Sequence, residues 1–266
     1  MKKWILFIAL AWSFAACDEI PPTINLTPPE RKVLVEEFTG VLCVNCPEGA
    51  ERLEALLEIH GENLIVVSIH SGFFAMPHQT SQFDFRTSEG EALDGLVGPV
   101  TFYPSASVNR KLFAGENSRI VNANSWAGYI QEELSRPSPI QMTINAEMDA
   151  LTRTVSGDVE LIYFEDLIDP TRLTIYLLET NITDSQIGED GLETDYIHRH
   201  VLRKAITPFD GQVLTNTVVS DQIQRIPFSS SIDENWHLPN LSLVAFVSTS
   251  SPNFEVQQVE QVKLAN

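Results

Sequence analysis

The sequence predicts two successive domains, an α/β domain over residues 31–136 and an all-β domain over residues 137–266. Three observations predict this order. Residues 33–69 have the pattern strand, helix, strand. The stiff, proline-containing segment at 136–139 separates the first part of the chain from the second, in which short segments with strand periodicity follow. A chain of 266 residues exceeds the usual size for one hydrophobic core, so we expect two.

A secretory signal precedes these domains. Lys2 and Lys3 are followed by an apolar run at residues 4–16, which is too short to span a bilayer but fits a signal peptide. The small residues before Cys17 resemble a bacterial lipobox, in which cleavage leaves that cysteine as the lipidated N-terminus. We therefore expect residues 1–16 to be removed and Cys17 to attach the chain to a membrane. An ordinary signal peptide with an incidental cysteine is the alternative.

Residues 17–30 contain four prolines and no core-like periodicity, which is typical of an extended tether. Asp18 and Glu19 directly follow the predicted anchor. In Bacteroidetes lipoproteins such acids resemble a signal for surface export, whereas enterobacterial sorting would retain the chain at the inner membrane. We expect an outer-membrane location and leave open whether the protein faces the periplasm or the cell surface.

The net charge excludes one class of partner. The chain has 17 basic and 36 acidic residues, a formal charge of −19, whereas binding to nucleic acid requires a basic surface. The sequence also contains no phosphate-binding loop and no Ser/His/Asp hydrolase motif.

A Cys-x-x-Cys pair is the strongest chemical signal. Residues 33–38 form an apolar strand, and Cys43 and Cys46 lie where the next helix begins, with Pro47 compatible with its first turn. Free backbone N–H groups and the helix dipole favour a thiolate there and lower the pKa of the first cysteine. Cys43 is therefore the predicted nucleophile and Cys46 the resolving cysteine, in an exchange that needs no bound cofactor.

Further elements complete the first domain. Apolar residues at helical spacing continue to Gly61, and the apolar run at residues 64–69 is typical of a buried parallel strand. An irregular insertion follows. We expect a helix near residues 89–96 and an outer helix over residues 118–134.

The hydrophobic pattern of the second half is typical of β-strands. Segments that alternate or run apolar occur at 140–146, 155–164, 173–179, 216–219, 222–228, 241–247 and 254–262. Seven or so strands joined by turn-rich segments predict an antiparallel, immunoglobulin-like β-sandwich.

Two pairs of histidines are candidate ligands for a metal or an anion. His70 and His78 could complete a metal site with the cysteines, but no second Cys-x-x-Cys accompanies them, so we predict no metal. His198 and His200 share one face if their segment is an extended strand. Such a pair can bind a metal or an anion; we favour hydrogen bonds between domains or at a sheet edge.

Several positions resemble the thioredoxin family. In that family an acid stands six residues before the first active cysteine, and a cis-proline packs against the disulfide. Glu37 and Pro104 match these positions, which implies that Glu37 shuttles protons and that Tyr103 contacts the substrate backbone. Strand periodicity sends Glu37 inward if Glu36 points outward. The alternatives are a solvent-exposed carboxylate at Glu37 and a trans proline at 104.

From about residue 33 to the C-terminus, the chain is similar to the Bacteroidetes lipoprotein family named after a twenty-eight-kilodalton outer membrane protein. The resemblance rests on residues 36–40, the Cys-x-x-Cys-Pro segment and residues 103–105, 196–203 and 241–247. It implies a thioredoxin-like first half and a β-sandwich second half, without a firm substrate.

Two functions fit these features. One is a thiol–disulfide oxidoreductase that exchanges with cysteines of exported proteins; the other is a non-enzymatic surface lipoprotein, adhesive or complex-forming, with a static disulfide. Asn45 replaces the thioredoxin proline and Leu42 its tryptophan, which leaves the direction of exchange and the partner open. Peroxide reduction is disfavoured because Gly40 stands where peroxiredoxins place threonine.

Overall fold

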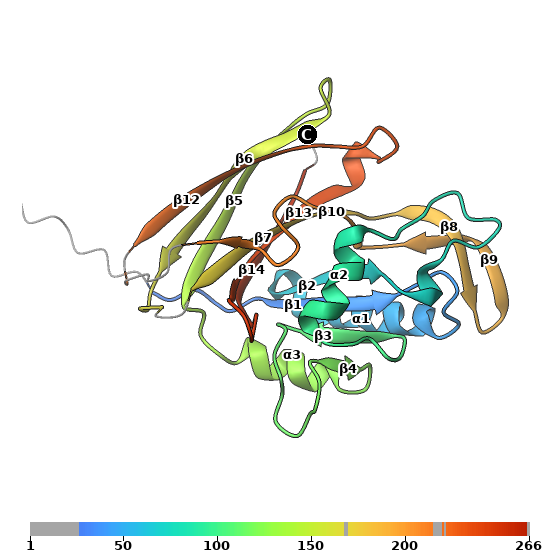
Figure 1. The fold of residues 1–266 in the computed structure, drawn as a ribbon, viewed down its shortest axis with the longest axis horizontal. Helices are drawn as coiled ribbons and strands as arrows, with labels where there is room; N and C mark the ends of the chain where they lie inside the picture. Colours follow the sequence, from blue (N-terminus) through green and yellow to red (C-terminus); the bar gives the residue numbers. More distant parts are fainter. Residues whose placement is uncertain (1–26, 168–169, 215–219, 221, 265–266) are drawn as a thin grey trace, which may run out of the picture.

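The computed structural model describes residues 27–167, 170–214, 220 and 222–264, and it is rich in β-structure (Figure 1). The helices are α1 (Cys46–His60), α2 (Ser88–Val97) and α3 (Trp126–Leu134). The strands of the first half are β1 (Val33–Thr39), β2 (Leu64–His70), β3 (Ser105–Val108) and β4 (Ile120–Asn122). Those of the second half are β5 (Ile140–Asp149), β6 (Thr154–Tyr163), β7 (Thr171–Glu179), β8 (Ile182–Gly188), β9 (Gly191–His198), β10 (Val201–Ala205), β11 (Gln212–Val213), β12 (Ile223–Ser231), β13 (Leu241–Thr249) and β14 (Val256–Lys263).

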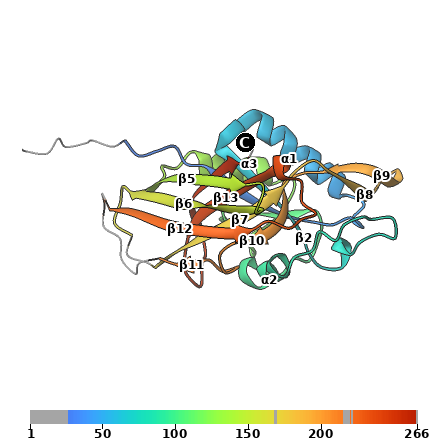
Figure 2. The ribbon, with the colours of Figure 1, turned by 90° about the horizontal axis from the view of Figure 1, so that it is seen from above.

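The strand–helix–strand unit forms as the sequence predicts. β1 and β2 pair in parallel, and α1 connects them. Both strands are buried along their whole length because helices cover both faces, α1 and α3 on one side and α2 on the other (Figure 2). Val35 therefore packs with Leu53 of α1, whereas Phe38 packs with Leu93 of α2.

One mixed sheet runs through both halves of the chain. Its order is β14-β13-β7-β10-β2-β1-β3-β4, with β11 added beside β7. The join is between β10 and β2, where Val201 pairs in parallel with Ser68. The pairing covers an edge of β2 that would otherwise expose backbone groups. The proposed boundary near residue 136 stays a prediction, but strands from either side of it share this sheet.

A second layer covers part of that sheet. Strands β12, β6 and β5 form an antiparallel sheet, drawn above β7 and β13 in Figure 1. Leu161 of β6, Ile175 of β7 and Leu243 of β13 share one buried cluster between the layers. The three-stranded sheet therefore packs on the part of the mixed sheet that the second half contributes, whereas a separate immunoglobulin-like sandwich stays a prediction.

The predicted helix over residues 118–134 was wrong at its start. Ile120 and Val121 belong to strand β4, and α3 begins only at Trp126. Both residues are β-branched, and Val121 pairs with Ala106 of β3, so cross-strand pairing prevails over helical spacing there. The strand expected at 216–219 lies outside the described residues.

Candidate functional site

A disulfide joins Cys43 and Cys46, with a Cα–Cα distance of 5.4 Å. The turn that leads from β1 into α1 holds both residues. The Cys43 N–H donates to the Gly40 carbonyl at 3.0 Å, and the Cys46 N–H donates to the Cys43 carbonyl at 3.2 Å. Cys46 is the first residue of α1. The pair therefore lies at the start of the helix, and the roles of nucleophile and resolving cysteine stay predictions.

Glu37 lies beneath the helix that carries this disulfide. Its side chain is buried, and the Ser68 hydroxyl donates a hydrogen bond to Oε2 at 3.1 Å. Oε1 has no partner and lies 3.4 Å from where a Cβ on Gly49 of α1 would stand. Burial raises the pKa of the Glu37 carboxyl to about 7. The residue can therefore gain and lose a proton near neutral pH.

Glu36 points to the opposite face, yet it is not in solvent. The Arg110 guanidinium donates to both of its oxygens, at 2.6 and 2.8 Å, and Tyr176 Oη lies 3.4 Å from Oε1. Both members of the pair are buried. Glu36 and Glu37 thus point to opposite faces of β1, as the strand period requires, but Glu36 is buried against Arg110 and Tyr176 and does not reach solvent.

The Tyr103–Pro104 peptide bond is cis. Pro104 packs on α1, since a Cβ on Gly49 would stand 2.7 Å from the Pro104 Cβ. The Tyr103 hydroxyl donates to the Ser71 carbonyl at 3.0 Å. Asn45 is one of the two residues between the cysteines. It lines, together with Pro104, one open cleft of about 410 Å³. The substrate groove at Pro104 and the contact of Tyr103 with a substrate stay predictions.

Sequence reasoning missed the cover over the disulfide. The hairpin of β8 and β9 extends from the second half of the chain over the start of α1 (Figure 1). The Gln186 amide nitrogen donates to the carbonyls of Gly40 and Cys43, at 3.2 and 3.1 Å. The Ile187 N–H donates to the Val41 carbonyl at 2.8 Å. With this cover in place, Cys43 is only 3% exposed.

Asp184 fixes the hairpin to the insertion that follows β2. Its carboxylate accepts hydrogen bonds from the backbone N–H groups of Gln82 and Phe83, both at 2.9 Å. Ile182 packs nearby with Val41 in a small apolar cluster. The signal that could have found the hairpin is the turn sequence at 188–191, but nothing local indicates where the hairpin docks.

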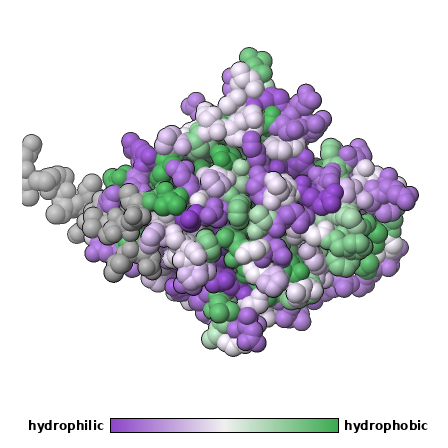
Figure 3. Space-filling view, viewed as in Figure 1, coloured by the Kyte–Doolittle hydropathy of each residue, from purple (hydrophilic) through white to green (hydrophobic). Residues whose placement is uncertain are grey.

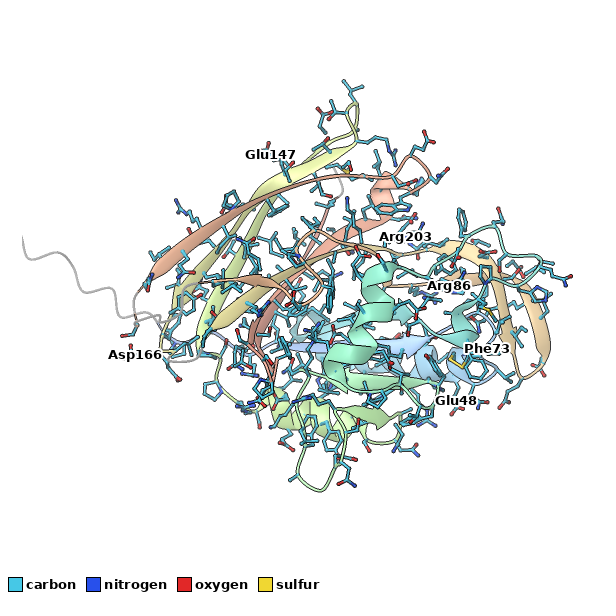
Figure 4. All side chains as sticks on the ribbon, in the orientation of Figure 1. Glu48, Phe73, Arg86, Glu147, Asp166 and Arg203 are labelled. Atoms are coloured by element: carbon cyan, nitrogen blue, oxygen red, sulfur yellow. A yellow bond between two sulfur atoms is a disulfide. The ribbon has the colours of Figure 1, made fainter. Side chains whose placement is uncertain are left out.

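Exposed apolar side chains gather at the same end of the molecule. Val44, Phe73, Phe74 and Phe102 are 45%, 70%, 39% and 41% exposed. Phe73 and Phe74 belong to one short turn, and the Phe74 ring lies 5.4 Å from that of Tyr103. Figure 4 labels Phe73 at this end of the molecule. Figure 3, in the same orientation, shows hydrophobic surface there. Apolar surface of this kind is typical of interaction sites.

The histidines do not form the two candidate pairs, His70 with His78 and His198 with His200. β9 ends at His198, and His200 has a φ of 55°, so the two do not share one extended strand. His198 packs against His70 with ring centroids 5.6 Å apart, whereas His200 Nε2 lies 3.1 Å from Glu54 of α1. His78 bonds Thr80 instead. Within residues 27–264 as described, no group of three His, Cys, Asp or Glu side chains could hold a metal ion.

Cys17 lies outside the described residues. Of the helices that the structure describes, none is long and apolar enough to cross a membrane.

The fold and the site define a class of protein: a mixed α/β sheet protein with a covered Cys-x-x-Cys disulfide above a buried acid. The chain belongs to the family described as outer membrane protein Omp28, which matches residues 97–266. Its place is therefore the outer membrane. The matched stretch begins after Cys46, so membership in the family does not itself account for the disulfide.

Two solved structures are similar over most of the chain, and a third over about half of it. HBP35 of Porphyromonas gingivalis is 21% identical with a TM-score of 0.72, over 88% of this chain and 76% of that one. A protein of Agrobacterium tumefaciens is 11% identical with a TM-score of 0.52, over 90% and 97%. A domain of the outer membrane lipoprotein Omp28 from Porphyromonas gingivalis is 21% identical with a TM-score of 0.34, over 48% and 89%. No curated protein matches.

Proposed function

We propose that this protein is a lipid-anchored thiol–disulfide exchange protein of the outer membrane, with a thioredoxin-like first half and an immunoglobulin-like sandwich in the second. Cys17 would carry the lipid, and exported proteins with cysteines would be the partners. The observation that carries the proposal is the position of the Cys43–Cys46 disulfide, at the start of α1 and above a buried carboxyl with a pKa of about 7.

The exchange would proceed in two displacements. A partner thiolate attacks Cys43 Sγ, the bond to Cys46 breaks, and the electron pair leaves on Cys46 Sγ, which takes up a proton. A second thiolate of the partner then attacks the partner sulfur of the mixed disulfide and releases Cys43. The partner is oxidised to a disulfide, and this protein is reduced to two thiols. Glu37 is the group placed to exchange the Cys46 proton.

Trapping in cells tests this proposal. In Cys46→Ala, Cys43 is a lone thiol that attacks a partner's disulfide in the reverse of the proposed exchange, and no Cys46 thiol can release the partner, so mixed disulfides should accumulate and dissolve on reduction. Cys43→Ala is the matched control, because it keeps the same number of thiols but leaves only Cys46. If both variants give the same bands, exchange with partners is wrong.

A static disulfide is the second candidate, and the cover over Cys43 favours it. Disulfides with a purely structural role have reduction potentials below about −300 mV. Titration of the full chain against glutathione separates the two functions. Exchange predicts a potential near that of the glutathione pool, whereas a structural disulfide would stay oxidised throughout.

A further inference from the structure

The polar face beneath α1 extends beyond Glu37. Side chains alternate along a strand, so Glu37 and Thr39 of β1 point to the same face as Val33, which packs with Leu53 of α1. On β2, Ser68 and His70 are their neighbours, because Glu37 pairs with Ser68 and Thr39 with His70. The end of this row lies where α1 begins.

A small cavity connects these residues with the disulfide. Its volume is about 20 Å³, and its lining includes Glu37, Cys46, Ser68, His70, Tyr196 and His198. A space of this size accommodates a water molecule. Cys46 and His70 thus line one small space that can hold a water molecule between them.

His70 reaches that cavity with unused hydrogen-bonding capacity. The His70 side chain is buried, with 3% of the residue exposed. Neither ring nitrogen meets the geometric criteria for a hydrogen bond, although the Ser68 backbone lies near the ring. His198, by contrast, has Nε2 at 3.3 Å from the Ser185 carbonyl. A buried polar atom without a partner destabilises the fold, so its retention requires an explanation.

The surroundings keep this imidazole neutral. Burial lowers the pKa of His70 well below its usual value, and His198 and Arg203 lower it further, whereas Asp84 opposes them weakly. Phe85 packs against the ring, with centroids 4.9 Å apart. A neutral imidazole has one N–H donor and one acceptor nitrogen.

We propose that His70 is a further catalytic residue for the redox chemistry, whose ring N–H donates a hydrogen bond to Cys46 Sγ once the disulfide is opened. This inference rests on the proposed function. Opening the disulfide leaves an electron pair on Cys46 Sγ, and a thiolate accepts hydrogen bonds better than a disulfide sulfur. The His70 N–H stabilises the charge on Cys46 Sγ until Glu37 delivers the proton, and no further reactant is needed.

Glutathione equilibria of the full chain test the role of His70. His70→Phe keeps an aromatic ring against Phe85 but removes the donor, and His70→Gln keeps an N–H donor. We expect His70→Phe to lower the equilibrium constant for reduction about tenfold, equivalent to about 30 mV, and His70→Gln to recover most of it. His78→Phe is the control, because His78 does not line this cavity, and we expect it to leave the constant within about twofold of wild type.

Equal constants for wild type and His70→Phe would overturn the inference. A wild-type disulfide that fails to exchange with glutathione would instead contradict the proposed function. If His70→Phe does not fold, ring-nitrogen NMR shifts of wild type decide: we expect the His70 signals to change on reduction more than those of His78. Unchanged His70 signals would show that no hydrogen bond forms.

Discussion

Replacing Glu37 with glutamine should stabilise the oxidised protein at alkaline pH and leave its stability near pH 4 unchanged. The carboxyl is buried, with one oxygen bonded to Ser68 and the other without a partner. Burial therefore favours the neutral acid. Glutamine is also neutral and has nearly the same shape, so it mimics the protonated side chain at every pH.

The size of the effect follows from two pKa values. The ordinary value is 4.5, and the folded protein raises the pKa of Glu37 to about 7. Between these values the unfolded chain binds fewer protons than the folded protein, so stability falls as pH rises. The contribution of Glu37 is complete below about pH 4.5 and lost above about pH 7. A difference of about 2.5 in pKa corresponds to about 3 kcal/mol, which glutamine should recover at pH 8.

Urea unfolding of the oxidised protein at pH 4, 6 and 8 measures this difference. Glu58→Gln, at an exposed position of α1, is the control, and as a surface substitution it should change stability little at each pH. A gain from Glu37→Gln that does not grow with pH would refute the reasoning, because it would show that folding does not change the pKa of the Glu37 carboxyl.

Three further outcomes follow from the contacts. Arg110→Met leaves Glu36 buried without its ion-pair partner and should lower the free energy of unfolding by about 3–5 kcal/mol; a second change, Glu36→Leu, should restore most of it. Gln186→Leu removes two hydrogen bonds that hold the hairpin over the disulfide, so a small thiol should reduce the disulfide about tenfold faster, as thiol release measured against wild type will show. Cys17→Ser should move the protein from the membrane fraction to the soluble fraction, and retention in the membrane would disprove the lipid anchor.

Local patterns were sufficient for the elements around the disulfide. The apolar run at 64–69 corresponds to β2, and the start of α1 at Cys46 follows from the proline and the acids of its first turn. These features depend on neighbours in sequence, which set backbone conformation and helix ends. The same reasoning failed at Ile120, where pairing with β3 determines the conformation.

Long-range contacts determine how accessible and how acidic the site is. Gln186 lies more than a hundred residues after Cys43, and no spacing rule indicates that its amide reaches the Cys43 carbonyl. His198 reaches His70 in the same way. The pKa of Glu37 depends on complete burial under α1, which periodicity could predict only as an orientation.

The amino-acid order thus dictates that a Cys-x-x-Cys pair begins a helix after a buried strand, because these features depend on conformational preferences of adjacent residues. Whether the disulfide is open or covered depends on a hairpin that reaches the site from the far half of the chain, and the partner of Glu36 is Arg110, 74 residues later in the sequence. Folding brings those groups together and removes water, and both effects depend on the assembled sheet rather than on any single segment.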